Sequence, residues 1–258
     1  MPQLTRTFRT RGYELDRSGR IGAAQFARYL EHLRWEALAD PTVALGRLFS
    51  HGNHLVVRAQ SIDLLKPTHH DEDLVATLDV TRVGRTSLSI GHTVYRSADG
   101  THVARGEITG VFIDGTGTPQ PIPDDVRSLA PATAPAPAPA PAPATAPAPA
   151  PAPEIELPII VRPSDTDLLQ HVNHARYIDY FDDARTNAAR ASAPGFPGAD
   201  NLVLTHFQIS YDTEAVSGDT LALRLAKSTD APLTFTGTLH RSADARVLAR
   251  AHLVLGPV

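Results

Sequence analysis

The sequence predicts an α+β fold that is built twice in one chain, each copy being a long helix followed by an antiparallel sheet. Three observations support this prediction. A run of alanine and proline separates two parts of similar length, short motifs recur in both parts, and each part shows helical periodicity followed by alternating polarity. We therefore expect domains at residues 1–130 and 154–258, joined by a linker at 131–153.

The linker reads PATAPAPAPAPAPATAPAPAPAP. Because nearly every second residue lacks an N–H donor, it cannot continue a helix or join a sheet. Such a segment is expected to be a polyproline II spacer that rises about 3.1 Å per residue, so it could reach roughly 70 Å.

The recurring motifs indicate a duplicated domain. The matched segments are 27–29 with 175–177, 62 with 209, and 104–105 with 249–250, at separations of 148, 147 and 145 residues. Chance matches would scatter, whereas a duplication with small deletions produces a slow drift in one direction.

Each half is expected to begin with a strand, at 6–15 and at 155–162. A helix over 23–38 follows in the first half, where Phe26, Tyr29 and Leu33 recur at spacings of three and four. Alternating segments separated by turn residues then predict the strands, which are 55–63, 73–82, 86–97 and 102–113. We expect the sheet to wrap around the helix.

Composition excludes several classes of function. There is no cysteine, which excludes disulfides, zinc–thiolate sites and a cysteine nucleophile. A net charge of -4 without a basic stripe argues against a nucleic-acid partner. The first residues lack an apolar leader segment and no apolar run approaches the length of a membrane span, so a cytoplasmic location is expected. The acidic and histidine-containing segment 69–73 looks like a metal site only superficially, and we expect a solvated loop there.

The segment 161–177, VRPSDTDLLQHVNHARY, resembles the hotdog thioesterases of the 4-hydroxybenzoyl-CoA and acyl-ACP types. Those families share an Asp-x-Asp pair, a short loop, a His-Val-Asn motif and a tyrosine-containing helix. The first half also resembles the N-terminal half of acyl-ACP thioesterases through its segments 12–17, 29–31 and 83–88.

This resemblance implies that the two sheets join edge to edge, so that the chain forms an internal pseudo-dimer, and pairs of this kind often assemble further. It also implies that an acyl-CoA or acyl-ACP thioester lies between the two central helices and is hydrolysed there. No metal or organic cofactor is implied.

The resemblance places Asp167 at the catalytic position, where it would act as general base or as nucleophile. His171 would polarise the carbonyl or orient water, and Asn173 would hold the loop across the helix. The backbone N–H of His174 would donate to the oxyanion. The alternative for Asp167 is that it only shapes the turn. The sequence departs from plant-type acyl-ACP thioesterases at Leu169, where those have asparagine.

The acyl chain is expected to contact Phe26, Tyr29 and Tyr177, and Arg85 would meet a phosphate of CoA or of the carrier protein. Both expectations follow from the resemblance. For Phe26 the alternative is ordinary core packing.

The first half is expected to be catalytically degenerate. At a separation of 148 residues, the four predicted catalytic positions correspond to Gly19, Ala23, Gln25 and Phe26. None of these side chains ionises.

Two other functions compete with hydrolysis. One is a hotdog hydratase or dehydratase, whose usual Asp and His pair lies in a different motif that this sequence lacks. The other is a non-catalytic module that binds acyl thioesters, which would gain support if Asp167 lay away from the domain interface.

Overall fold

The computed structural model describes residues 4–40, 42–43, 45–46, 53–129, 154–198, 201–229 and 231–257. The linker predicted at 131–153 lies outside the described residues. The first half consists of β1 (Leu4–Arg9), a 3-10 turn η1 (Gly12–Glu14), α1 (Ala23–Ala39), β2 (His54–Leu64), β3 (Asp73–Val83), β4 (Ser87–Arg96), β5 (His102–Ile113) and α2 (Asp124–Arg127). The second half consists of β6 (Glu154–Ile160), a 3-10 turn η3 (Pro163–Asp165), α3 (His174–Arg190), β7 (Leu202–Tyr211), β8 (Thr220–Lys227), β9 (Thr234–Arg241) and β10 (Val247–Pro257).

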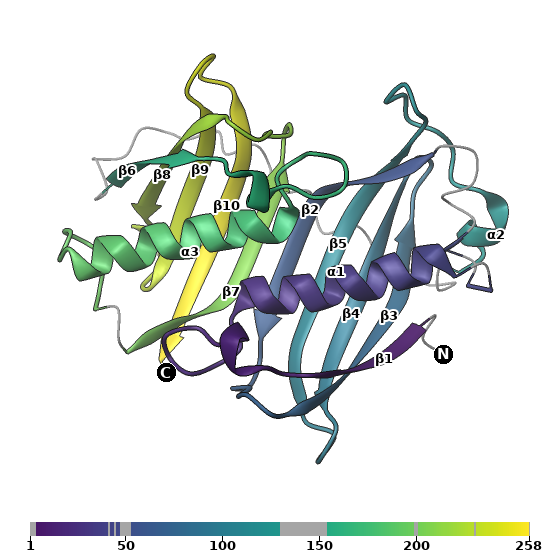
Figure 1. The fold of residues 1–258 in the computed structure, drawn as a ribbon, viewed down its shortest axis with the longest axis horizontal. Helices are drawn as coiled ribbons and strands as arrows, with labels where there is room; N and C mark the ends of the chain where they lie inside the picture. Colours follow the sequence, from purple (N-terminus) through teal and green to yellow (C-terminus); the bar gives the residue numbers. More distant parts are fainter. Residues whose placement is uncertain are drawn as a thin grey trace.

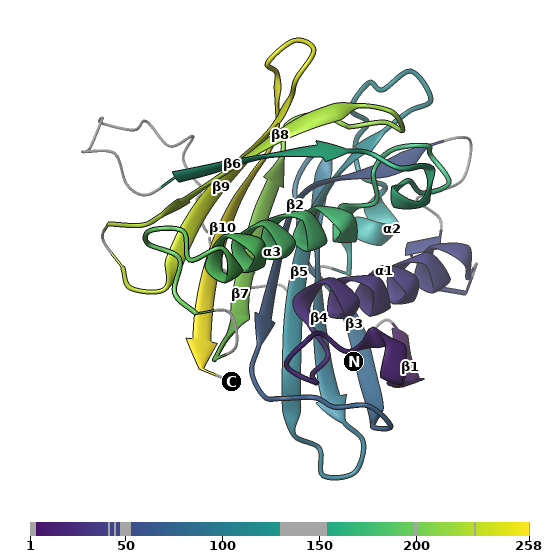
Figure 2. The same ribbon diagram turned by 60° about the vertical axis from the view of Figure 1, so that its left-hand side comes forward.

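The two halves share one antiparallel sheet. In the described residues it has ten strands in the order β1-β3-β4-β5-β2-β7-β10-β9-β8-β6. The halves join where β2 pairs with β7, with Ile62 opposite Phe207 and Asp63 opposite His206. Helices α1 and α3 lie side by side across one face of this sheet (Figures 1 and 2). This is the arrangement predicted for a tandem hotdog pair, and the fold class is confirmed.

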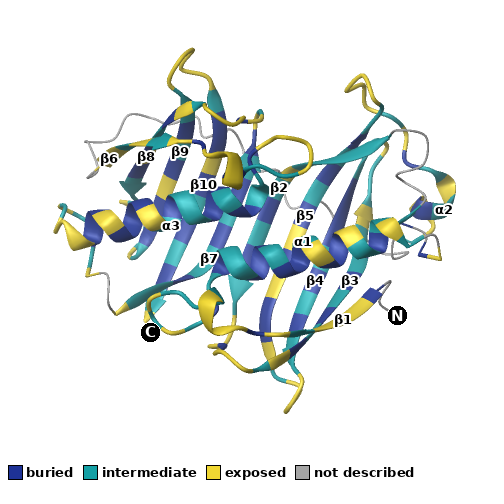
Figure 3. Ribbon diagram, viewed as in Figure 1, coloured by how far each residue is buried: buried dark blue, intermediate teal, exposed yellow. Residues whose placement is uncertain are grey.

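The core lies between the helices and the sheet, where the strand residues beneath the helices are buried (Figure 3). Leu30 and Leu33 of α1 are at most 1% exposed. The sheet makes room for the helix side chains with glycines, because a Cβ added at Gly237 would lie 2.5 Å from Phe181. Close packing of this kind leaves no slack for an extra methyl group.

The first predicted strand was wrong in its length. Residues 6–15 do not form one strand, because β1 ends at Arg9 and a 3-10 turn follows. Glu14 closes this turn by donating its N–H to the Arg11 carbonyl at 3.0 Å, while its carboxylate accepts the Arg11 N–H at 2.8 Å. The predicted helix over 23–38 is confirmed as α1.

The separation of 148 residues that the sequence predicted between matching positions of the two helices was also wrong, by three residues. Helices α1 and α3 both have 17 residues and begin 151 positions apart. Tyr29 donates its hydroxyl to Glu14, and Tyr180 donates its hydroxyl to Asp165, so each pair is the counterpart of the other. The Ala-Arg-Tyr match at 148 residues was therefore a coincidence, whereas the separations of 147 and 145 in the sheet hold.

Among the described residues, no helix combines the length and apolar character that a membrane span requires. The same residues contain no group of three or more His, Asp or Glu side chains placed to share a metal ion.

Candidate active site

The loop before α3 is a tight turn built around Asp167. Its N–H donates to the His171 carbonyl at 2.9 Å, and its carbonyl accepts from Gln170 at 3.0 Å. Gln170 adopts a left-handed backbone with φ of 62°. The Asp167 Oδ1 accepts the Leu169 N–H at 2.8 Å, and its second oxygen has no hydrogen bond to the described residues. Asp167 therefore shapes the turn with one oxygen and leaves the other without a hydrogen bond to the described residues.

His171 lies beside Glu214, a residue that the sequence analysis did not single out. An isolated bridge pairs His171 with Val216, and the Val172 N–H donates to the Ala215 carbonyl at 2.8 Å. The pKa of Glu214 is lowered, first by its own backbone N–H and further by Thr213, His171 and Arg241, which together outweigh partial burial. The sequence signal for Glu214 was its position three residues after the end of β7, the strand that pairs with β2 where the two halves join.

Asn173 caps α3 and reaches the other half of the protein. Its Oδ1 accepts the Ala175 N–H at 2.9 Å, and its Nδ2 donates to both carboxylate oxygens of Glu31 on α1, at 2.8 and 2.9 Å. The Arg176 N–H donates to the Asn173 carbonyl. The N–H groups of Ala175 and Arg176 thus have acceptors, whereas the N–H of His174, the first residue of α3, has none among the described residues. A free N–H at a helix start is well placed to receive an oxyanion.

The His174 side chain points into the join between the halves. Its Nε2 lies 2.7 Å from Nη2 of Arg34 on α1, and its Nδ1 lies 3.6 Å from a Glu31 oxygen. Burial, aided by the Arg34 charge, lowers the pKa of His174 well below its usual value. The ring is therefore neutral, and Nε2 accepts a hydrogen bond from the guanidinium.

The four predicted catalytic residues thus lie together on one loop and helix start, and of the predicted substrate contacts Tyr177 lies near them, beside Ala215 and Glu214. Phe26 is 1% exposed and belongs to the core. Tyr29 bonds to Glu14, and the Tyr177 ring meets Tyr211 edge to face with centroids 5.2 Å apart. Arg85 is exposed in the turn between β3 and β4.

The first half repeats the turn around Asp16. The Asp16 N–H donates to the Arg20 carbonyl at 2.7 Å, and its carbonyl accepts from Gly19 at 3.0 Å. Its Oδ1 accepts the Ser18 N–H at 2.7 Å. Asp16, and not Gly19, is therefore the counterpart of Asp167, which corrects the expectation that the first half has no carboxylate there.

The other counterparts in the first half do differ in chemistry. The residues Arg20, Gly22, Ala23 and Pro67 stand where the second half has His171, Asn173, His174 and Glu214, respectively. The first half has kept the turn and its carboxylate without the histidines, the amide or the second carboxylate.

A cavity of about 730 Å³ lies beside this first-half turn, between it and α3. Its walls carry charges of both signs, among them Arg28, which is ion-paired with Asp179. The residues with catalytic chemistry lie at the second-half turn, so we place the candidate site there and not at this cavity.

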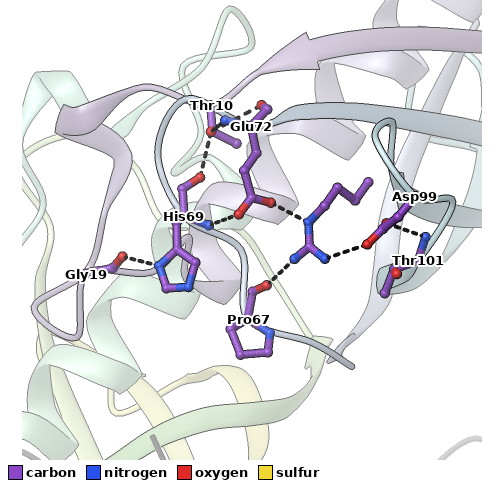
Figure 4. Close-up of polar contacts among 8 residues, drawn as sticks. Thr10, Gly19, Pro67, His69, Glu72, Asp99 and Thr101 are labelled. Carbon is purple, nitrogen blue, oxygen red and sulfur yellow. Dashed lines mark hydrogen bonds and ion pairs between the residues drawn. The ribbon is translucent and has the colours of Figure 1, made fainter.

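A set of polar contacts made by Arg96, Glu72 and His69 supports the first-half turn, and we call this set the bracket (Figure 4). Arg96 donates to Glu72 at 2.8 Å and to the Pro67 carbonyl at 2.8 Å, while His69 contacts the Gly19 carbonyl at 3.1 Å. Segment 69–73 is exposed apart from the half-buried Glu72, as expected for a solvated loop, and through His69 and Glu72 it also braces the turn.

The second half has the same bracket. Arg241 donates to Asp219 at 3.2 Å and to the Glu214 carbonyl at 2.8 Å. Arg241 therefore fixes the segment that carries Glu214.

Comparison with known proteins supports a family assignment. A model described as the thioesterase-like superfamily matches residues 11–129 and 161–258. Among solved structures, an acyl-ACP thioesterase from Bacteroides thetaiotaomicron is 17% identical, with 99% of this chain and 100% of that chain covered and a TM-score of 0.78. A protein described as an oleoyl thioesterase from Lactobacillus plantarum is 20% identical, with 98% and 96% covered and a TM-score of 0.78.

A 12:0-ACP thioesterase from Umbellularia californica is 15% identical, with 99% of this chain and 97% of that chain covered and a TM-score of 0.74. At these identities the likeness is one of fold. Because it spans both halves in all three cases, the double arrangement itself is shared.

Proposed function

The chain belongs to the thioesterase-like superfamily, and on that premise we propose that it hydrolyses acyl thioesters to a free acid and a thiol at the second-half turn. One observation carries the proposal. Asp167, the His171–Glu214 neighbours and the unpaired His174 N–H all meet at the start of α3, which Asn173 and His174 tie to α1 of the other half.

The proposed chemistry assigns each group a separate task. The thioester carbonyl oxygen points to the His174 N–H, which receives the negative charge that develops there. Asp167 either removes a proton from the attacking water or attacks the carbonyl itself. In the first route the water oxygen forms the C–O bond, the C–S bond breaks and the thiolate takes up the proton that Asp167 removed. In the second route the Asp167 oxygen forms the C–O bond and the thiolate leaves, and water then hydrolyses the acyl–aspartyl anhydride, releasing the acid and giving a proton to the thiolate. His171, next to Glu214, orients the water or polarises the carbonyl.

The acyl group is carried either by CoA or by an acyl carrier protein. The solved relatives named for acyl-ACP substrates share the fold of this chain, which supports a carrier-bound or CoA-bound acyl group as the class of substrate. The Leu169 side chain replaces an amide of plant-type relatives, so the proposed mechanism assigns no task to that position.

The direct test is thiol release from a series of acyl-CoA and acyl-ACP esters by the wild type and by Asp167→Asn. Turnover by the wild type that collapses in the variant supports the proposal, and the preferred carrier identifies the partner. Turnover that survives in Asp167→Asn would remove Asp167 from the mechanism.

A second candidate is a module that binds acyl thioesters without hydrolysing them. It is favoured by the hydrogen bond from the Leu169 N–H to Asp167, because Asp16 accepts the equivalent bond in the half that lacks the histidines and Glu214. An aspartate at this position can therefore be kept for the turn alone. Calorimetric binding of acyl-CoA without any thiol release would select this function.

A further inference from the structure

A group of polar side chains is buried beneath α1 at the join of the halves. Arg34, Gln60 and His92 come from α1, β2 and β4, and they are 5%, 2% and 3% exposed. Arg34 Nη1, Gln60 Nε2 and both ring nitrogens of His92 have no hydrogen-bond partner among the described residues. A buried polar group left without a partner destabilises the folded protein, so the group calls for an explanation.

These side chains lie close to one another and to His174. Burial lowers the pKa of His92 well below its usual value, the charges of Arg34 and His174 act in the same direction, and the nearby Gly106 backbone, which lies outside hydrogen-bond geometry, opposes them only in part. Gln60 accepts the Tyr211 hydroxyl at 3.3 Å, and the same hydroxyl lies 3.1 Å from the His174 carbonyl. The group therefore reaches the residue whose N–H is proposed to hold the thioester oxygen.

The fold itself does not need polar residues at the positions of Gln60 and His92. In the second half the counterparts of Gln60 and His92 are Phe207 and Gly237, which pack with Phe181 in an apolar core. The Phe181 and Phe207 ring centroids lie 6.1 Å apart. At these two positions the first half, which faces the candidate active site, has hydrogen-bonding groups where the second half has apolar packing, whereas a buried arginine is present in both halves, as Arg34 and Arg185.

The chemistry of the group defines what it would bind. The free nitrogens of Arg34 and Gln60 can only donate, so their complement is an oxygen acceptor. Burial lowers the pKa of Arg34 to about 10, which keeps it charged at neutral pH. Glu31 is the nearby counter-charge, which raises that pKa. With the charge of Arg34 already balanced, a neutral acceptor such as a ketone oxygen fits better than a second carboxylate.

We infer that Arg34, Gln60 and His92 recognise an extra carbonyl on the acyl chain close to the thioester, so that the preferred substrates are 3-oxoacyl thioesters. This inference rests on the proposed hydrolysis at the second-half turn. Arg34 Nη2 lies 2.7 Å from Nε2 of His174, so an oxygen bound by Arg34 would lie close to the residue whose N–H is proposed to hold the thioester carbonyl. A plain alkyl chain held against this group would leave these donors unpaired.

The test compares three four-carbon esters, acetoacetyl-CoA, butyryl-CoA and succinyl-CoA, or the same acyl groups on a carrier protein if CoA esters are not used. The readout is the ratio of kcat/KM for acetoacetyl to that for butyryl in each enzyme. A variant that is less active toward both esters keeps the same ratio, so a general loss of activity does not affect the readout. The higher intrinsic reactivity of the oxo ester raises the ratio equally in every enzyme, so it does not affect the comparison between variant and wild type. We expect the ratio to fall at least tenfold in Arg34→Met.

Arg185→Met is the matched control. Arg185 is the counterpart of Arg34 on α3, is 3% exposed and also has an unpartnered Nη1. We expect it to keep the wild-type ratio. If Arg34→Met does not fold, Gln60→Leu serves in its place, because the fold accepts an apolar residue at the counterpart position, Phe207.

The outcomes separate this inference from the proposed function. Equal ratios in the wild type and in the Arg34 variant, with thiol still released, overturn the inference and leave hydrolysis standing. A preference for succinyl-CoA over acetoacetyl-CoA overturns it in favour of an anionic acyl group. No thiol release from any ester contradicts the proposed function.

Discussion

Asp16 and Asp167 hold the same position in two copies of one turn, each accepting the N–H two residues ahead through Oδ1, at 2.7 and 2.8 Å. An aspartate at this position therefore has a folding role in both halves. Any catalytic role of Asp167 must come from what surrounds it, namely His171, Glu214 and the start of α3.

This relationship predicts opposite results for two matched variants. Asp167→Asn should lower kcat for thiol release at least 100-fold, because the amide still accepts the Leu169 N–H but cannot serve as base or nucleophile. Asp16→Asn should leave kcat within about twofold, since its turn lacks the other groups, while melting temperatures of both variants should stay close to that of the wild type.

Steady-state thiol release and thermal unfolding of the two variants measure this. A comparable loss of activity in Asp16→Asn would show that the first-half turn also takes part in the reaction.

The two brackets offer a second matched pair. Arg241→Met removes donors to Asp219 and to the Glu214 carbonyl, and Arg96→Met removes the equivalent donors to Glu72 and the Pro67 carbonyl. Both variants should lose about 1–3 kcal/mol of unfolding free energy. Only Arg241→Met should lower kcat, by about tenfold, because it alone frees the segment that carries Glu214.

Urea unfolding and thiol release distinguish these effects. If Arg96→Met lost as much activity as Arg241→Met at equal stability, the bracket would act through the whole sheet and not through Glu214.

The fold could be predicted from the sequence because its signals are local and repeated. The proline-rich segment, the periodicity of α1 and the alternation in the strands each reflect a constraint on a short stretch of chain. The length of the first strand was wrong because the Arg11–Glu14 turn depends on a carboxylate contact that alternation does not reveal.

The candidate site could be predicted only in part. Asp167, His171, Asn173 and His174 lie within eight consecutive positions and carry a family motif, whereas Glu214 approaches them from the loop after β7 and Arg34 from α1 of the other half. The counterpart of Asp167 was missed because a three-letter match set the alignment, and only the hydrogen bonds of the turn identify Asp16. Contacts between distant segments leave no pattern in one sequence.

The contact between Asn173 and Glu31 predicts that the site depends on both halves. Glu31→Gln should lower kcat several-fold and cost about 1.5–3 kcal/mol, because Asn173 loses a charged acceptor and Arg34 loses its counter-charge. The matched control is Asp182→Asn, at the counterpart position on α3, where the carboxylate pairs with Arg185 at 2.8 Å.

Asp182→Asn should be destabilised to a similar extent without loss of kcat for thiol release. Full activity in Glu31→Gln would mean that the cap of α3 needs no help from α1.

The buried histidines predict how stability depends on pH. The pKa values of His92 and His174 both lie well below the usual value, through burial first and the Arg34 charge second. Below about pH 6.5 the unfolded chain binds a proton on each ring while the folded protein binds neither. The free energy of unfolding therefore falls as the pH drops from about 6.5, by about 1.4 kcal/mol per pH unit for each histidine.

His92→Leu should make this slope shallower by about 1.4 kcal/mol per pH unit, because one of the two proton-binding sites of the unfolded chain is gone. Urea unfolding at pH 5.0, 5.5, 6.0 and 7.5 measures the slope, and His70→Gln in an exposed loop controls for the loss of a histidine from the surface. An unchanged slope in His92→Leu would mean that the folded protein protonates His92, which the neighbouring guanidinium of Arg34 opposes. A bound oxygen acceptor would instead raise the free energy of unfolding at every pH and leave the slope unchanged, because it adds no proton to the folded state.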